Sequence, residues 1–190
     1  IEGNQAYIDF DAQNTKTEGG FNKLNIAVSR LQHLGGKLST FISLSAQLAS
    51  KNLDSSQKFY LGGPFSVAGY PTGQVSGDDG ALLHLDLRRD FYTQPWGGIF
   101  QASVFYAYGW NRMYKDPWPG WEGTNTIITN DISLQSIGVG FNQNWSQGIV
   151  IRGMLGWQVG ENDSRDPVTG NAIDQSDEDY RGWLQGIYYF

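Results

Sequence analysis

The feature that most constrains the fold of this chain is a period-two alternation of apolar and polar residues, repeated along most of its length. In residues 37–49, Leu38, Ile42 and Leu44 alternate with serines and a glutamine. Because successive side chains of a β-strand point to opposite faces, such runs predict strands with two unlike faces. The runs cover residues 23–29, 37–49, 81–88, 100–110, 131–145, 149–159 and 180–190, with a weaker one near 5–12, and predict eight antiparallel strands.

The apolar face of these runs carries no charge over about ten residues per strand, which is roughly the length that crosses a bilayer at a tilt. Aromatic residues gather near the strand ends, as in the girdles of outer-membrane barrels: Tyr106, Tyr108, Trp110, Trp157, Tyr180, Tyr188 and Phe190. The opposite face holds serine, glutamine, glycine and scattered charges, which suits a wet lumen. A soluble β-sandwich or lipocalin-like barrel is the alternative, with the uncharged face as its packed core.

One strand changes phase. Within residues 131–145, Ile132 and Leu134 give way to Ile137 and Val139. A shift of one residue in the alternation is what an extra residue in a strand produces. The pattern therefore predicts a β-bulge in this strand.

The connections alternate between tight turns and long polar loops, the latter at about residues 50–80, 111–130 and 161–178. Outer-membrane barrels place short turns in the periplasm and long loops outside. The sequence therefore predicts an all-β fold, an antiparallel transmembrane β-barrel in the bacterial outer membrane with a periplasmic C-terminus. The ending "GIYYF", with Tyr188 and Phe190, resembles the C-terminal signature of such barrels, which implies recognition by the barrel-assembly machinery.

Composition narrows the chemistry. The chain has 190 residues, no cysteine and two distant histidines, so no metal or other cofactor is expected. The net charge of −6 falls within residues 161–179, and no basic patch remains for nucleic acid. Neither that acidic loop nor "SGDDG" has the ligand spacing of a calcium loop. Because the chain opens with "IEGNQ", we expect a piece of a longer protein.

Residues 52–91, "NLDSSQKFYLGGPFSVAGYPTGQVSGDDGALLHLDLRRDF", break the alternation. Their asparagine-leucine pair, LGGP, VAGY and GDDG before a strand closely resemble the ShlB/FhaC/HecB hemolysin secretion and activation transporters of two-partner secretion, in the BamA-like superfamily. The resemblance implies the last eight strands of a sixteen-stranded barrel in residues 1–190. It also implies that residues 51–80 form a glycine-rich loop that returns into the lumen. From composition alone, an extracellular loop fits equally well.

The resemblance assigns a set of functional residues to this loop: Leu61, Gly62, Gly63, Pro64, Phe65, Val67, Ala68, Gly69, Tyr70, Gly77, Asp78 and Gly80. Two positions depart from the family pattern. Ala68 replaces the arginine of VRGY, and Ala107, in "FYAYG", replaces the aspartate that this arginine reaches in the family. Losing one partner of such a pair costs about 3 to 5 kcal/mol, whereas losing both is nearly neutral. We therefore expect Phe65, Val67 and Tyr70 to hold the loop by packing.

The function implied is an outer-membrane pore that exports a large secreted partner protein of the hemolysin or adhesin type, in contact with lipid and lipopolysaccharide. An outer-membrane assembly factor and a passive porin are the alternatives. Five residues should face the lumen near the loop: His84, Asp86, Arg88, Phe105 and Ala107. His84 and Asp86 also raise the possibility of a hydrolase, but the sequence positions no serine beside them, and we expect no enzyme.

Overall fold

The computed structural model describes residues 5–92, 97–122, 129–160, 164 and 177–190. The acidic loop after Gly160 lies almost entirely outside these residues. The elements in chain order are α1 (Gln5–Gln13), β1 (Lys23–Gly35), β2 (Leu38–Ala49), a 3-10 turn (Ser55–Gln57), β3 (Phe59–Leu61), β4 (Val75–Gly77), β5 (Asp79–Tyr92), β6 (Ile99–Arg112), β7 (Asp131–Asn144), β8 (Ile149–Gln158) and β9 (Tyr180–Tyr188).

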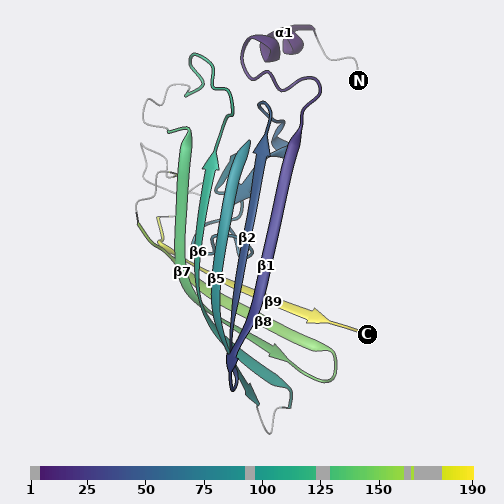
Figure 1. Ribbon diagram of the computed structural model, residues 1–190, viewed down its shortest axis with the longest axis vertical. Helices are drawn as coiled ribbons and strands as arrows, with labels where there is room; N and C mark the ends of the chain where they lie inside the picture. Colours follow the sequence, from purple (N-terminus) through teal and green to yellow (C-terminus); the bar gives the residue numbers. More distant parts are fainter. Residues whose placement is uncertain (1–4, 93–96, 123–128, 161–163, 165–176) are drawn as a thin grey trace.

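Seven long strands form one curved antiparallel sheet in the order β1-β2-β5-β6-β7-β8-β9, and β3 pairs with β4 in a small hairpin (Figure 1). Apart from the β3–β4 hairpin, which lies between β2 and β5 in the sequence, each strand pairs with the next strand along the chain. The register is continuous along β5, β6 and β7. The sheet is open, with β1 and β9 at its edges. It therefore has the meandering connectivity of a barrel wall, as expected.

The predicted strand near residues 5–12 is wrong, because this segment forms α1. It lies beyond the end of β1, where no neighbouring strand is available to pair with it (Figure 1). Its C-terminal end is fixed by the Asp11 carboxylate, which accepts from the Thr17 and Glu18 amides at 3.0 and 2.9 Å. No helix among the described residues is long and apolar enough to cross a membrane. The described sheet thus contains seven of the eight strands predicted.

The uncharged face of the sheet is exposed rather than packed. Its large apolar side chains include Leu44, Leu87, Val104, Val139 and Leu184, which are 42 to 78% exposed. We call this the outer face. In a soluble sandwich these residues would form the core, so the structure favours a face built for lipid.

Polar residues mark the limits of this apolar band. Arg30 and Arg89 occupy the outer face near the tight turns. Towards the long loops, the outward-facing Gln135 accepts a hydrogen bond from the Tyr106 hydroxyl at 2.9 Å. An aromatic hydroxyl at the boundary between apolar and polar surface is the arrangement expected at a membrane interface.

The predicted bulge in β7 is also wrong. The pairing of β7 with β6 runs without a register shift from Asp131 to Asn144. Ile132 and Leu134 are instead ordinary inner-face residues, 4% and 0% exposed, and they belong to the only apolar cluster found among the described residues. The phase of the alternation changes because apolar residues are needed on different faces at the two ends of one regular strand.

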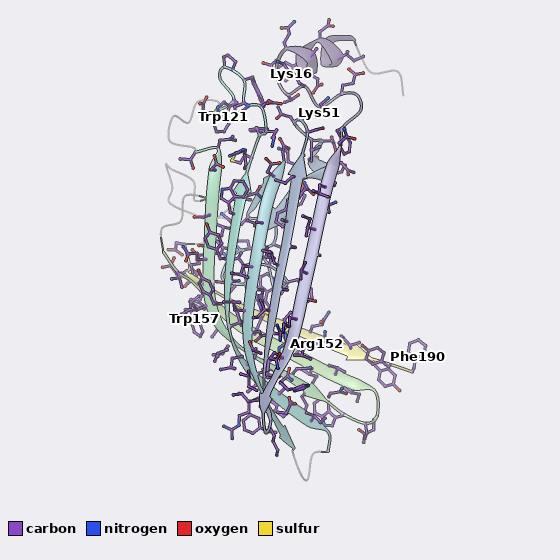
Figure 2. The ribbon with its side chains drawn as sticks, in the orientation of Figure 1. Lys16, Lys51, Trp121, Arg152, Trp157 and Phe190 are labelled. Carbon is purple, nitrogen blue, oxygen red and sulfur yellow. The ribbon has the colours of Figure 1, made fainter. Side chains whose placement is uncertain are left out.

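The two ends of the sheet differ. Tight turns join β1 to β2 and β7 to β8, and the chain terminus returns beside the second turn, where the Tyr189 amide donates to Gly148 O at 2.9 Å. The other end carries the long connections, with Lys16, Lys51 and Trp121 (Figure 2). The C-terminus therefore lies at the short-turn end.

Candidate functional site

The segment between β2 and β5 crosses one face of the sheet. Side chains from four strands hold its backbone: Gln47 Nε2 of β2 donates to Asp78 O at 3.0 Å, Asn111 Nδ2 of β6 to Phe59 O at 2.8 Å, Gln158 Nε2 of β8 to Gly69 O at 3.1 Å, and Trp183 Nε1 of β9 to Ala68 O at 2.9 Å. These strands span nearly the whole sheet, about 24 Å at the usual strand spacing. We call the segment, residues 51–80, the inner loop, and the face it covers the inner face.

An apolar cluster seats the inner loop. Leu61, Val67, Tyr70 and Val75 of the loop pack with Ala107, Ile132 and Leu134 of β6 and β7. All seven are at most 8% exposed. Each large side chain buried in this way contributes about 1.5 to 3 kcal/mol. At this cluster the loop is therefore held against the wall by apolar packing.

The packing prediction is right for Val67 and Tyr70 and wrong for Phe65. Val67 and Tyr70 are fully buried, whereas Phe65 is 79% exposed. The backbone turns between them, with the Ser66 amide donating to Gly63 O at 3.1 Å and the Tyr70 amide to Val67 O at 3.1 Å. This turn points Val67 into the seat and leaves Phe65, together with Pro64, on the open side of the loop.

Close backbone contact explains why particular positions are glycine. A Cβ added to Gly69 would lie 2.8 Å from the β8 backbone, and one added to Gly156 of β8 would lie 2.8 Å from the loop backbone. Gly62 has φ +100° and would place a Cβ 2.1 Å from Pro71 O. Gly63 also has a positive φ, and added Cβ atoms at Gly77 and Gly80 would meet Asn111 and Phe59. The loop is thus in van der Waals contact with the wall.

Both alanines that replace the family's ion pair are buried. Ala107 is 0% exposed within the apolar seat, and Ala68 is 1% exposed against Gly156. Neither site leaves an unpaired charge, and the Ala68 carbonyl is anchored by Trp183. Packing and backbone hydrogen bonds occupy the place of the missing pair.

Asp78 is the polar centre at the base of the loop. Its buried carboxylate accepts from the Leu53 amide at 3.0 Å and the Lys115 amide at 2.8 Å, and it pairs with Lys58 Nζ at 3.1 Å. The neighbouring Asp79 accepts from the Ala49 amide and from Lys115 Nζ, both at 2.8 Å. The sequence motif indicated Asp78 as functional, but the roles of Lys58, Asp79 and Lys115 depend on contacts that no local pattern reveals.

Two further groups tie the loop base to the β6–β7 connection. Asn52, from the asparagine-leucine motif, donates to Asp116 O at 2.9 Å and accepts from the Asp116 amide at 2.7 Å. Trp118 and Trp121 both pack edge-on against Tyr114, with ring centroids 4.8 and 5.7 Å apart. Burial, reinforced by the Asp78 charge, raises the pKa of Tyr114. Hydrogen bonds from Asn52 therefore join the base of the inner loop to the β6–β7 connection.

His84, Asp86 and Arg88 lie on the inner face of β5, as predicted, and Phe105 and Ala107 face them from β6. Arg88 pairs with Asp86 at 2.7 Å, whereas His84 Nε2 is 3.9 Å from the same carboxylate. His84 stacks on Phe105 with centroids 5.6 Å apart. Ser43 lies opposite His84 on β2, but among the described residues no hydrogen bond joins the two. The Asp86 carboxylate thus lies closer to Arg88 than to His84.

The assembly-signal residues lie at the end of the chain. Tyr188 and Phe190 contact each other with ring centroids 6.3 Å apart, and both are exposed. Figure 2 shows Phe190 at the free end beyond β9. Across the described residues no cluster of three metal-ligating side chains occurs. The functional roles of the terminal and loop residues stay predictions.

An antiparallel meander with an apolar outer face, and a loop seated on its polar inner face, defines a segment of a transmembrane β-barrel wall. The family described as "Haemolysin secretion/activation protein ShlB/FhaC/HecB" matches residues 4–120, which is more than half of the chain. The chain therefore belongs to this family.

Individual relatives are consistent with this family. The chain is 31% identical over 124 residues to the heme/hemopexin transporter protein HuxB of Haemophilus influenzae strain 86-028NP, covering 64% of this chain and 21% of HuxB. With HuxB of strain Rd it is 29% identical over 135 residues, covering 70% of this chain and 23% of HuxB. The chain thus spans about a fifth of the length of these relatives.

Solved structures share the fold. CdiB from Escherichia coli matches with a TM-score of 0.68 at 16% identity, covering 98% of this chain and 29% of CdiB. CdiB from Acinetobacter baumannii matches with a TM-score of 0.58 at 16% identity, covering 89% of this chain and 27% of that one. The open sheet is therefore part of the wall of a larger barrel.

Proposed function

We propose that this chain is the C-terminal part of an outer-membrane pore that translocates a large secreted partner protein, of the hemolysin or adhesin type. Family membership supports the class of activity, since the family is described as haemolysin secretion/activation proteins and the relative HuxB as a heme/hemopexin transporter protein. The observation that carries the proposal is the inner loop, which is seated by Val67 and Tyr70 and bonded to four strands. A loop fixed to the lumen wall shapes the path of a passing chain while leaving the centre open.

The two unlike ends of the sheet support the orientation that we propose. With the tight turns and Phe190 in the periplasm, the long loops and α1 lie outside the cell. The apolar outer face meets acyl chains, and Trp118 and Trp121 lie at the level where lipopolysaccharide sugars begin. Tyr188 and Phe190 present the terminal aromatic residues to the barrel-assembly machinery.

The test uses the full-length protein in cells that also produce a candidate secreted partner protein. Gly69→Val introduces a side chain into a position where even a Cβ lies 2.8 Å from backbone, so the loop no longer docks. Gly20→Val is the matched control, because a Cβ there meets nothing within 4 Å. We expect Gly69→Val to reduce the partner in the medium while the barrel still assembles, as judged by its heat-modifiable migration on gels.

Unchanged secretion by Gly69→Val would contradict the role of the loop. The alternatives give different results in the same cells. A passive porin conducts small solutes steadily and requires no partner. An assembly factor, when depleted, lowers the amounts of unrelated outer-membrane proteins.

A further inference from the structure

The chain that leaves β6 runs along the base of the inner loop. Residues 112–121 comprise the last residue of β6 and the first part of the β6–β7 connection, and we call them the strap. The Arg112 carbonyl accepts from the Asp78 amide at 2.8 Å. The Met113 carbonyl accepts from Lys58 Nζ. The strap therefore begins with two backbone carbonyls bonded to the loop.

The next part of the strap donates to the loop. The Lys115 amide donates to the Asp78 carboxylate and Lys115 Nζ to that of Asp79, both at 2.8 Å. The Asp116 amide donates to Asn52 Oδ1 at 2.7 Å, and Asn52 Nδ2 donates back to the Asp116 carbonyl at 2.9 Å. These contacts reach both ends of the inner loop, which starts next to Asn52 and ends next to Asp79.

The polar groups of the two segments satisfy one another. Asp78 and Asp79 are at most 1% exposed, so their carboxylates depend on protein donors rather than on water. On the side of the strap, the Lys115 and Asp116 amides use acceptors that belong to the loop. A buried polar group that loses its partner is costly. Departure of either segment therefore leaves unpaired groups in the other.

The strap also reaches the apolar cluster that seats the loop. The Met113 side chain packs against this cluster, to which Leu61, Val67 and Tyr70 of the loop belong. Lifting the strap removes Met113 from the cluster and uncovers part of it. The contact between strap and loop thus extends from the base of the loop to the packing of residues 61–70.

Tyr114 joins the inner side of the strap to its outer side. Lys58 Nζ of the loop lies 4.2 Å from the centre of the Tyr114 ring, and Trp118 and Trp121 pack edge-on against the same ring. Trp121 lies at the long-loop end of the sheet (Figure 2). In the part of the chain that the structure describes, no hydrogen bond or ring contact joins either tryptophan to the loop. The tryptophans therefore allow the strap to be perturbed from its outer side.

We propose that the strap and the inner loop undock as one unit, so that the strap, at the long-loop end, controls the docking of a loop that covers the inner face. The coupling is reciprocal, because a change that loosens either segment loosens the other by the same factor. A molecule that binds the tryptophan side of the docked strap would stabilise the docked loop. The coupling holds whether or not the protein exports a partner, and so it goes beyond the proposed function.

The competing arrangement is a strap that β7 holds in place without the loop. Asn130, which precedes β7, accepts from the Met113 and Tyr114 amides, both at 2.9 Å, and its side chain donates to Tyr114 O at 2.8 Å. These bonds provide no acceptor for the Lys115 and Asp116 amides. Because those two donors are bonded only when the loop is docked, we expect the loop contacts to dominate.

The experiment measures hydrogen exchange in the full-length protein in lipid nanodiscs and compares Trp118→Ala with Phe21→Ala. Phe21 is the matched control, because it is an aromatic residue outside the strap and is 42% exposed. Loss of one edge-on aromatic contact corresponds to about fivefold faster exchange. We expect this increase in peptides covering residues 113–116 and, by the same factor, in peptides covering residues 61–70. Phe21→Ala should change neither, and Trp121→Ala should repeat the result of Trp118→Ala.

The reverse experiment loosens the loop and measures the strap. Gly69 lies against the β8 backbone, where an added Cβ would be 2.8 Å away, so Gly69→Val disturbs the loop at a site remote from the strap. We expect exchange to become faster in residues 113–116 by the same factor as in residues 61–70. Gly20→Val is the control, because a Cβ there meets nothing within 4 Å.

The outcomes separate coupling from independent anchoring. Faster exchange of the strap alone in Trp118→Ala would overturn the coupling, and so would a strap that stays protected in Gly69→Val while residues 61–70 exchange faster. If both tryptophan variants leave the strap unchanged, the result of Gly69→Val decides. None of these measurements involves secretion, so their failure leaves the proposed function standing, and a failure of export leaves the coupling standing.

Discussion

Replacement of Asp78 by alanine should loosen the base of the inner loop, where the Asp78 carboxylate joins Leu53 and Lys58 of the loop to the Lys115 amide. Asp78 is fully buried, and its partner Lys58 is only 10% exposed at the side chain. Removing one member of a buried ion pair costs about 3 to 5 kcal/mol, and the unpaired Leu53 and Lys115 amides add about 1 kcal/mol each. Water entering the site offsets part of this, so we expect a loss near 4 kcal/mol in the free energy of loop docking.

Hydrogen exchange measures this loss directly. The Gly63 amide donates to Tyr70 O at 3.0 Å, and the Tyr70 amide to Val67 O, so both are protected only while the loop keeps its fold. A change of 4 kcal/mol corresponds to about a thousandfold faster exchange in peptides covering residues 61–70. The measurement uses the full-length protein in lipid nanodiscs, with peptides from β6 and β7 as the reference for an intact barrel.

Two companion variants separate the ion pair from general damage to the loop. Asp54→Ala removes an exposed carboxylate that caps the Ser55–Gln57 turn through the Ser56 amide, and it should speed exchange only slightly. Lys58→Met combined with Asp78→Ala removes both charges and should recover much of the protection. If Asp78→Ala exchanges no faster than Asp54→Ala, the view of Asp78 as the polar centre of the loop base is wrong.

Three further predictions follow from other contacts. Gly69→Val should speed exchange across residues 61–70 far more than Gly20→Val, and equal effects would show that close packing at Gly69 is unimportant. Trp183→Phe keeps an aromatic ring but loses the hydrogen bond to Ala68 O, so loop docking should weaken by about 1 kcal/mol, which corresponds to about fivefold faster hydrogen exchange. An unchanged exchange rate would show that this hydrogen bond does not hold the loop. Burial raises the pKa of Asp11, but hydrogen bonds from Thr15, Thr17 and Glu18 outweigh it and hold the pKa below its usual value. The charged form therefore stabilises the segment after α1 above about pH 4, and this contribution disappears as the pH falls through the lowered pKa. At pH 7, Asp11→Asn should speed hydrogen exchange of the Glu18 amide, which donates to Asp11. Unchanged protection of that amide would show that the Asp11 carboxylate does not stabilise this segment.

Much of the wall could be predicted from the sequence because its signal is local. Alternation in residues 37–49 or 100–110 shows which side chain faces which way, and a membrane leaves the apolar face uncharged. The predictions failed where the determining contact is distant. Ile132 and Leu134 are apolar because the inner loop, some sixty residues earlier, packs on them. From the sequence alone, the change of phase at Ile132 and Leu134 looks like the effect of a β-bulge.

The loop shows the same limit at finer scale. Phe65 and Val67 are both apolar, and nothing in "PFSVAGY" indicates that one is buried and the other exposed. The turn that begins at Gly63 determines which of the two side chains is buried. Likewise, residues 5–12 alternate like a strand but lie beyond the last possible partner, so local helix formation prevails over strand pairing.

In the pore that we propose, the glycine contacts between the inner loop and the wall would affect the width of the channel. Gly156 and Gly109 present no side chains on the inner face where the inner loop lies, so its backbone settles at a depth that side chains would otherwise fill. A bulkier residue at either position would push the loop towards the axis and reduce the open cross-section. In that pore the open cross-section would therefore depend partly on the absence of side chains at Gly109 and Gly156, and enlarging a wall residue under the loop would offer a way to narrow the conduit without altering its charge.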